Sequence, residues 1–71
     1  MNILITAMLP QEYRIKICCD ADILPRIKKI AGVNRVAENA LFTNQYIVHL
    51  SGAAHIEDVR ARLDNLNREH A

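Results

Sequence analysis

The sequence predicts a two-layer α+β sandwich whose strands and helices follow the order β-β-α-β-β-α. Three observations lead to this prediction. The chain has 71 residues, enough for one small domain, which we expect to span residues 1–71. Two segments, Tyr13–Cys19 and Gln45–Leu50, alternate with the period of two that is typical of half-buried strands. Two further segments, about 23–31 and 53–67, repeat apolar residues at helical spacing.

The first two strands are expected to form a hairpin. The segment Asn2–Leu9 is rich in Ile and Leu without helical spacing, and Pro10 ends it. A short turn then leads into the Tyr13 strand. One face of that strand carries Tyr13, Ile15, Ile17 and Cys19, and the other carries Arg14, Lys16 and Cys18. The first face is therefore expected in the core.

The first helix is expected to begin between Asp22 and Pro25. The Asp22 carboxylate can accept from free N–H groups of the first turn, and Pro25 suits that turn because it lacks an N–H. Gly32 is expected to end the helix in a left-handed conformation. The apolar face of this helix comprises Ile23, Leu24, Ile27, Ile30 and Ala31.

The segment Asn34–Phe42 reads as an edge strand because Glu38 interrupts its apolar face of Val36, Ala40 and Phe42. Thr43 and Asn44 suit a two-residue turn. In the strand that follows, Tyr46, Val48 and Leu50 share one face and Ile47 and His49 the other.

The second helix is predicted to run from about Ala53 to Asn67, with Asp58–Arg62 and Glu57–Arg60 pairs on its outer side. The helical and strand patterns together predict one core. Its members are Ile15, Ile17, Ile27, Ile30, Val36, Val48, Leu50, Ile56, Val59, Leu63 and Leu66.

These elements match a circularly permuted ferredoxin-like layout. From the Tyr13 strand onward the order is β-α-β-β-α, which lacks the last strand of that plan. The Asn2–Leu9 strand would take the missing place. We therefore expect a four-stranded sheet with both helices on one face, and with the Tyr13 and Gln45 strands central and parallel.

The stretch from Ile23 to Leu66 resembles small ferredoxin-fold modules such as heavy-metal-associated and ACT domains. The likeness rests on "IKKIAGVNRV" (Ile27–Val36), on "QYIVHL" and on the amphipathic helix that follows. The metal-binding family carries a Cys-x-x-Cys loop before its first helix, whereas this chain has adjacent Cys18 and Cys19. The resemblance therefore implies a fold and no activity.

The helix-free face of this sheet is the predicted interaction surface. Its residues are Arg14, Lys16, Cys18, Leu41, Ile47 and His49, joined by one side of the Asn2–Leu9 strand. A partly apolar sheet face is unusual on a small monomer, and two-fold pairing is the commonest way to bury one. We expect a non-enzymatic protein–protein interaction or regulatory module, either a homodimer or bound to a protein partner.

Two other functions remain open at this stage. The first is a small-ligand or metal-sensing domain, because Cys18 and His49 are expected side by side on the central strands and both can ligate metals. The second is a nucleic-acid-binding sheet. The net charge of +1 speaks against it, and so does the placement of Tyr13, Phe42 and Tyr46 on core faces.

No catalytic or cofactor motif is recognisable, so we expect neither an enzyme nor a bound cofactor. Adjacent cysteines on a strand point to opposite faces, which disfavours a disulfide. The apolar N-terminal run is much shorter than a membrane span, and no basic segment precedes it. We therefore expect a cytoplasmic protein without a membrane partner.

Overall fold

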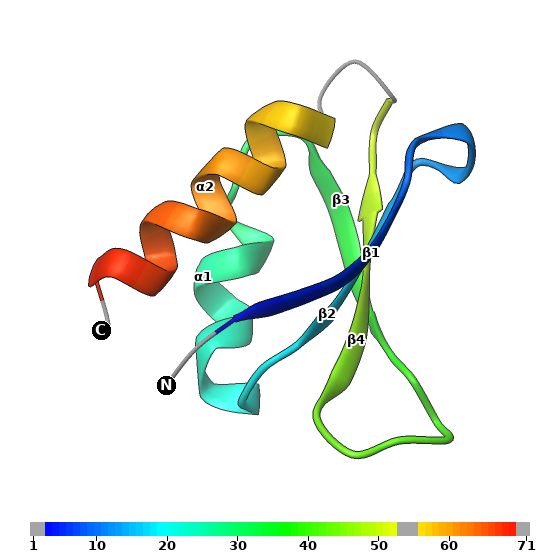
Figure 1. Cartoon of the computed structure of the whole chain (residues 1–71), viewed down its shortest axis with the longest axis vertical. Helices are drawn as coiled ribbons and strands as arrows, with labels where there is room; N and C mark the ends of the chain where they lie inside the picture. Colours follow the sequence, from blue (N-terminus) through cyan, green and yellow to red (C-terminus); the bar gives the residue numbers. More distant parts are fainter. Residues whose placement is uncertain (1–2, 53–55, 70–71) are drawn as a thin grey trace.

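The computed structural model describes residues 3–52 and 56–69, and it arranges them in two layers. A four-stranded sheet forms one layer, and two helices cover one of its faces (Figure 1). The elements, in chain order, are β1 (Leu4–Leu9), η1 (Pro10–Glu12), β2 (Arg14–Cys18), η2 (Ala21–Ile23), α1 (Leu24–Lys28), β3 (Val33–Glu38), β4 (Gln45–Leu50) and α2 (Ile56–Glu69). The predicted α+β class is confirmed.

The strands lie in the order β1-β2-β4-β3, and every neighbouring pair is antiparallel. The prediction that the two central strands are parallel was wrong. The chain passes through α1 from β2 to β3, and β4 then folds back between these two strands. The parallel pair is therefore β2 and β3, which are not neighbours. This order is compatible with a permuted ferredoxin-like layout.

The β1–β2 hairpin turns through η1, which ends at Tyr13 in the left-handed conformation with φ of 57°. The expectation that Tyr13 continues the buried face of β2 was wrong. A left-handed residue interrupts the strand alternation, and the Tyr13 residue is 49% exposed. The register between β1 and β2 shifts at Thr6, whose hydroxyl donates to the Lys16 carbonyl at 3.2 Å.

Helix α1 begins where expected but is shorter, because it ends at Lys28 and the chain continues in turns closed by bonds from the Ile30 N–H to the Ile27 carbonyl and from the Val33 N–H to the Ile30 carbonyl, both at 3.1 Å. Pro25 lies at the start of α1, as predicted. Asp22 does not cap the helix, since it lies within η2 and no side chain caps either element. Backbone carbonyls satisfy these N–H groups instead, as in the bond from the Ile23 N–H to the Asp20 carbonyl at 3.2 Å. Gly32 has a φ of 95°, so its predicted left-handed conformation is confirmed, but it does not end α1, whose C-cap is Lys29.

Strand β3 is an edge strand, as predicted, but it ends four residues earlier than expected. Asn39 ends it by forming a turn: its side-chain oxygen accepts from the Leu41 N–H at 3.1 Å, and its carbonyl accepts from the Phe42 N–H at 3.2 Å. The connection to β4 therefore runs over residues 39–44 in place of a two-residue turn. Asn44 supplies the positive φ, 63°, that brings the chain into β4.

Helix α2 carries an apolar face against the sheet and ion pairs on its outer side. The predicted start at Ala53 lies outside the described residues. Arg60 pairs with Glu57 at 3.0 Å, as predicted, and also with Asp64 at 3.2 Å. The predicted Asp58–Arg62 pair is absent from the ion pairs of the described part of the chain. No helix in residues 3–52 and 56–69 is long and apolar enough to span a membrane.

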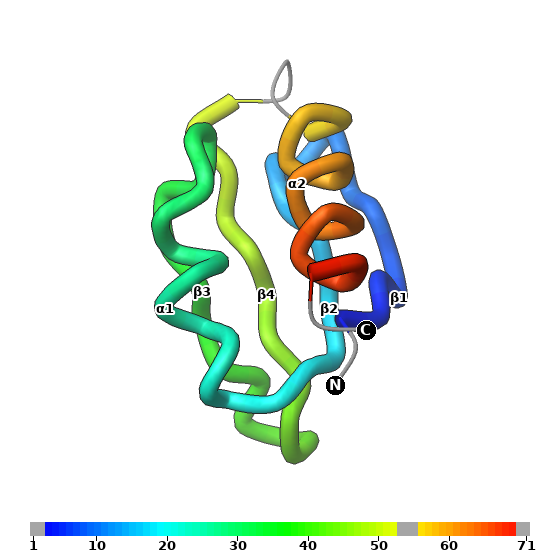
Figure 2. Tube along the Cα trace, turned by 90° about the vertical axis from the view of Figure 1, so that its left-hand side faces the viewer, coloured from blue at the N-terminus to red at the C-terminus, as the bar shows by residue number. Residues whose placement is uncertain are grey.

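The core lies between the sheet and the helices, and Figure 2 shows α1 beside β3 and α2 beside β1 and β2. Its buried members are Ile3, Ile15, Ile17, Cys19, Ile23, Ile27, Tyr46, Val48, Leu50, Ile56, Val59 and Leu63. Of the predicted core, only Ile30, Val36 and Leu66 are partly buried, and they pack against its edge. The helices are thus confirmed on one face, and no helix or strand of residues 3–52 and 56–69 covers the other face.

The end of α2 is tied to the beginning of β1 by one side chain. The Asn67 amide nitrogen donates to the Ile3 carbonyl at 2.7 Å, and its amide oxygen accepts from the Ile3 N–H. The side chain thereby satisfies both backbone groups of a residue that precedes the sheet. This contact joins segments 64 residues apart in the sequence.

Candidate functional site: the open sheet face

The face of the sheet opposite the helices, named here the open sheet face, consists of three rows that cross the strands. The rows follow from the pairing register, since paired residues share a face and buried residues mark the core side. The first row is Leu4, Cys18 and Gln45. The second row is Ala7, Lys16, Ile47 and Ala37, and the third is Leu9, Arg14, His49 and Arg35.

The third row brings three basic side chains together. Arg14 pairs with His49 across β2 and β4, and Arg35 pairs with the same His49 across β3 and β4. Neighbouring strands lie about 5 Å apart, so the imidazole has a guanidinium-bearing residue on each side. Lys16 lies in the adjacent row on β2. We call Arg14, His49 and Arg35 the basic row.

Negative charge is missing from this face. None of the eight Asp and Glu residues of the chain occupies a position in its three rows. Glu12 in η1 approaches Arg14 at 3.7 Å, and both side chains are exposed. Within residues 3–52 and 56–69, no ion pair is formed by Lys16 or Arg35. Solvent and any partner are therefore the only sources of countercharge for these two groups in the described structure.

The pKa of His49 is lowered from its ordinary value, first by partial burial and then by the charges of Arg35 and Arg14. The imidazole is therefore predominantly neutral at pH 7. Both guanidinium groups act on the ring because the register places Arg14 and Arg35 opposite His49.

Apolar side chains complete the open sheet face. Leu4 is 63% exposed at the edge of the sheet. Ile47, Ala37, Ala7 and Leu9 are partly buried and lie in the two rows that carry the basic groups. The face therefore combines an apolar surface with a cluster of positive charge at one end.

The structure places five of the six residues expected on this face within its rows. Leu41 lies instead on the loop between β3 and β4, where it is 83% exposed, because β3 ends at Glu38. Sequence reasoning did not name Arg35, although the strand alternation around the inward-facing Val36 contained the signal. The residues of β1 were expected only as one unassigned side of a strand, and the register shift at Thr6 explains why alternation alone did not select them.

Cys18 and His49 are not side by side, contrary to expectation. Cys18 pairs with Gln45 in the first row and His49 with Arg14 in the third. The antiparallel register thus puts them at opposite ends of the face, about 13 Å apart along the strands. In the described residues no group of three or more His, Cys, Asp and Glu side chains is placed to hold a metal ion.

Cys19 faces the core and is chemically different from its neighbour. Burial raises the pKa of its thiol to about 11, with smaller contributions from Cys18, Asp20 and Asp22. The thiol therefore stays protonated at neutral pH, which is the unreactive form of a cysteine.

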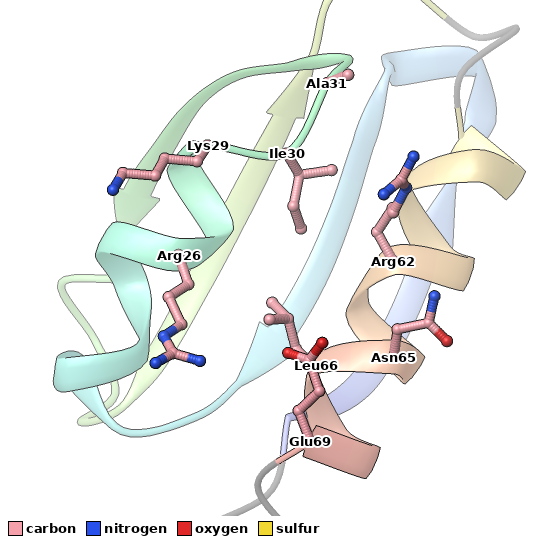
Figure 3. Close-up of a pocket in the computed structure, with 8 residues that line it drawn as sticks. All are labelled: Arg26, Lys29, Ile30, Ala31, Arg62, Asn65, Leu66 and Glu69. Carbon is pink, nitrogen blue, oxygen red and sulfur yellow. The ribbon is translucent and has the colours of Figure 1, made fainter.

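A groove of about 360 Å³ separates α1 from α2 on the helical side (Figure 3). Ile30 and Leu66 point toward each other across it. Its rim carries Arg26 and Lys29 from the α1 side and Arg62 and Glu69 from α2. The groove mixes both signs of charge, so it offers a less distinctive surface than the open sheet face.

Comparison of the chain with protein-family models, with curated proteins and with solved structures found no match.

Proposed function

We propose that this protein is a non-enzymatic interaction module that docks an acidic segment of a partner protein on the open sheet face. The observation that carries this proposal is the basic row beside the partly buried apolar residues Leu9, Ala37 and Ile47, on a face whose rows contain no carboxylate. Charge complementarity of this kind guides a partner to one surface and fixes its orientation. The apolar residues supply the area that gains from being removed from water.

The apolar character of the face favours a protein partner over a nucleic acid. Sheets that bind single-stranded RNA or DNA stack bases on exposed aromatic side chains. None of the three aromatic residues of the chain belongs to the rows of this face. Tyr46 is buried in the core, and Phe42 lies on the β3–β4 loop.

The charge distribution also favours an acidic partner over face-to-face pairing of two copies. A two-fold axis parallel to the strands would bring Arg14, Lys16 and Arg35 of one copy against the same residues of the other. An axis across the strands would place Arg14 and Arg35 against the uncharged first row, again without countercharge. Like charges brought together at an interface are unfavourable unless carboxylates separate them. The rows of the open sheet face supply none.

The direct test is calorimetric titration with a synthetic peptide in which Glu alternates with Leu. We expect binding that weakens with added salt, and weaker binding by the same peptide with Gln in place of Glu. Ile47→Asp puts a carboxylate in the middle row and should abolish binding without unfolding the protein. Ala61→Asp is the matched control, because Ala61 is exposed on α2 and belongs to none of the rows.

Equal affinity of the peptide for Ile47→Asp and the parent protein would refute the proposal. So would tighter binding by a single-stranded oligonucleotide, which would assign the face to nucleic acid. Analytical ultracentrifugation of the free protein tests the remaining alternative, that a second copy of the protein binds to this face. A dimer that Ile47→Asp dissociates and Ala61→Asp does not would assign the face to a second copy.

A further inference from the structure

We propose that the basic row anchors a phosphate monoester, so that the acidic segment docked on the open sheet face carries a phosphorylated side chain at this position. The inference rests on the proposed function, since it specifies the group that the partner presents to Arg14, His49 and Arg35. A phosphate monoester carries a charge of about −1.5 to −2 near neutral pH and three acceptor oxygens.

The register supplies the geometry for this anchor. Arg14 and Arg35 lie on β2 and β3, on either side of His49 on β4. Their Cα atoms are thus about 10 Å apart, two strand spacings. An arginine side chain is long enough for both guanidinium groups to converge on one group above the imidazole. The Arg14 side chain is 39% exposed, so it has room to reorient.

The number of donors matches a phosphate better than a carboxylate. Each guanidinium presents a planar set of five N–H donors and one positive charge, whereas a carboxylate offers two acceptor oxygens and one negative charge. Two guanidinium groups therefore bring two positive charges, which one carboxylate neutralises only by half and a phosphate monoester neutralises almost completely. Three phosphate oxygens can engage both arginines together.

The groups around the basic row leave room for such an anion. Arg14 forms an ion pair with Glu12. The distance of 3.7 Å between its guanidinium nitrogen and the Glu12 oxygen is longer than the roughly 2.7–2.9 Å of a charge-assisted hydrogen bond. Arg35 forms no ion pair with the rest of the described chain. A docked dianion therefore displaces at most one weak, exposed contact.

His49 provides a signature of the bound dianion. The charged groups near it are Arg14 and Lys16 on β2 and Arg35 on β3, with Glu12 reaching the row through Arg14. In the free protein the two arginines disfavour the imidazolium. A phosphate above the row reverses the sign of the local field, so the pKa of His49 should rise in the complex.

The experiment compares three peptides of one sequence, based on the Glu–Leu peptide, with serine, aspartate or phosphoserine at the central position. We expect the phosphoserine peptide to bind about tenfold more tightly than the aspartate peptide, because it brings a second charge and a third oxygen. Arg14→Gln or Arg35→Gln should reduce the phosphoserine peptide to the affinity of the aspartate peptide. Arg62→Gln on α2 is the control and should change neither affinity. NMR titration of the His49 ring should show a larger rise of its pKa with the phosphoserine peptide than with the aspartate peptide.

The outcomes separate this inference from the proposed function. If phosphoserine and aspartate peptides bind equally well and both are weakened equally by Arg35→Gln, the acidic docking face stands and the phosphate anchor is refuted. If none of the peptides binds, both proposals fail. Tighter binding by inorganic phosphate alone, or by an oligonucleotide that contains only phosphodiesters, would overturn the assignment to a phosphorylated protein segment.

Discussion

At the scale of single residues, some side chains stabilise the fold through contacts with residues that are distant in the sequence. Asn67 is an ordinary polar residue on a helix in the sequence, yet its amide satisfies both backbone groups of Ile3. Nothing near Asn67 in the sequence indicates this partner, because the contact spans 64 residues. Such contacts need the fold before they can be recognised.

Replacing Asn67 should destabilise the protein. Asn67→Ala leaves the buried Ile3 with an unsatisfied carbonyl and N–H, and an unsatisfied buried polar group costs about 1–3 kcal/mol. Urea unfolding followed by circular dichroism measures this difference. Asn65→Ala, at an exposed position of the same helix, is the control and should stay within about 0.5 kcal/mol of the parent. A similar loss in both variants would show that the Asn67 contact contributes nothing specific.

The two cysteines should differ in reactivity. Burial of the Cys19 thiol raises its pKa from 9.0 to about 11, so at pH 8 it should react with iodoacetamide much more slowly than Cys18. Peptide mapping by mass spectrometry after a short exposure gives both rates. Faster modification of Cys19 than of Cys18 in the folded protein would contradict its placement in the core.

The same pKa shift predicts how stability changes at high pH. The folded protein holds the Cys19 proton more tightly than the unfolded chain does. The contribution is therefore complete below pH 9 and is lost as the pH rises toward 11. Urea unfolding across this interval should show a falling free energy of unfolding. In Cys19→Ala the free energy of unfolding should decrease less over the same pH interval, because the thiol is gone. An equal decrease in the variant and the parent would exclude the Cys19 thiol as the cause.

At the scale of elements, periodicity predicted regular segments well and turns poorly. The alternation of β2 and β4 selected Ile15, Ile17, Val48 and Leu50 correctly as core residues. Tyr13 and Phe42 were predicted on core faces because the sequence pattern is strand-like at both positions. In the structure Tyr13 lies in the turn before β2, and Phe42 lies in the loop after β3. Left-handed residues and side-chain turns stop an element without changing its apolar pattern.

The helical side of the core should be the most sensitive to truncation. Ile27 on α1 and Leu63 on α2 are completely buried, and Ile→Ala or Leu→Ala at such sites costs about 2–5 kcal/mol. A domain of this size has little stability to lose, so thermal unfolding should show a large drop in Tm. Leu66→Ala is the matched change, because Leu66 is only partly buried on the same helix and should cost less. Equal effects at Leu63 and Leu66 would contradict the burial described here.

At the scale of the whole molecule, the division between a covered and an uncovered sheet face organises the proposed function. The net charge of +1 conceals this division, because the acidic residues lie on η1, in and just before η2, at the end of β3 and on α2, whereas the rows of the open sheet face have only basic ones. Composition therefore argued against a nucleic-acid-binding sheet and did not indicate a basic face. The sheet register was needed to place Arg35 beside His49 and to move Cys18 away from it.

The central claim is that the open sheet face is where an acidic segment docks. Chemical-shift mapping tests it most directly, by titrating the Glu–Leu peptide into isotopically labelled protein. We expect the largest changes in chemical shift on β2 and β4 and on Arg35 of β3, while the amide shifts of α2 stay unchanged. Shift changes concentrated on α1 and α2, around the groove that Ile30 and Leu66 line, would contradict it.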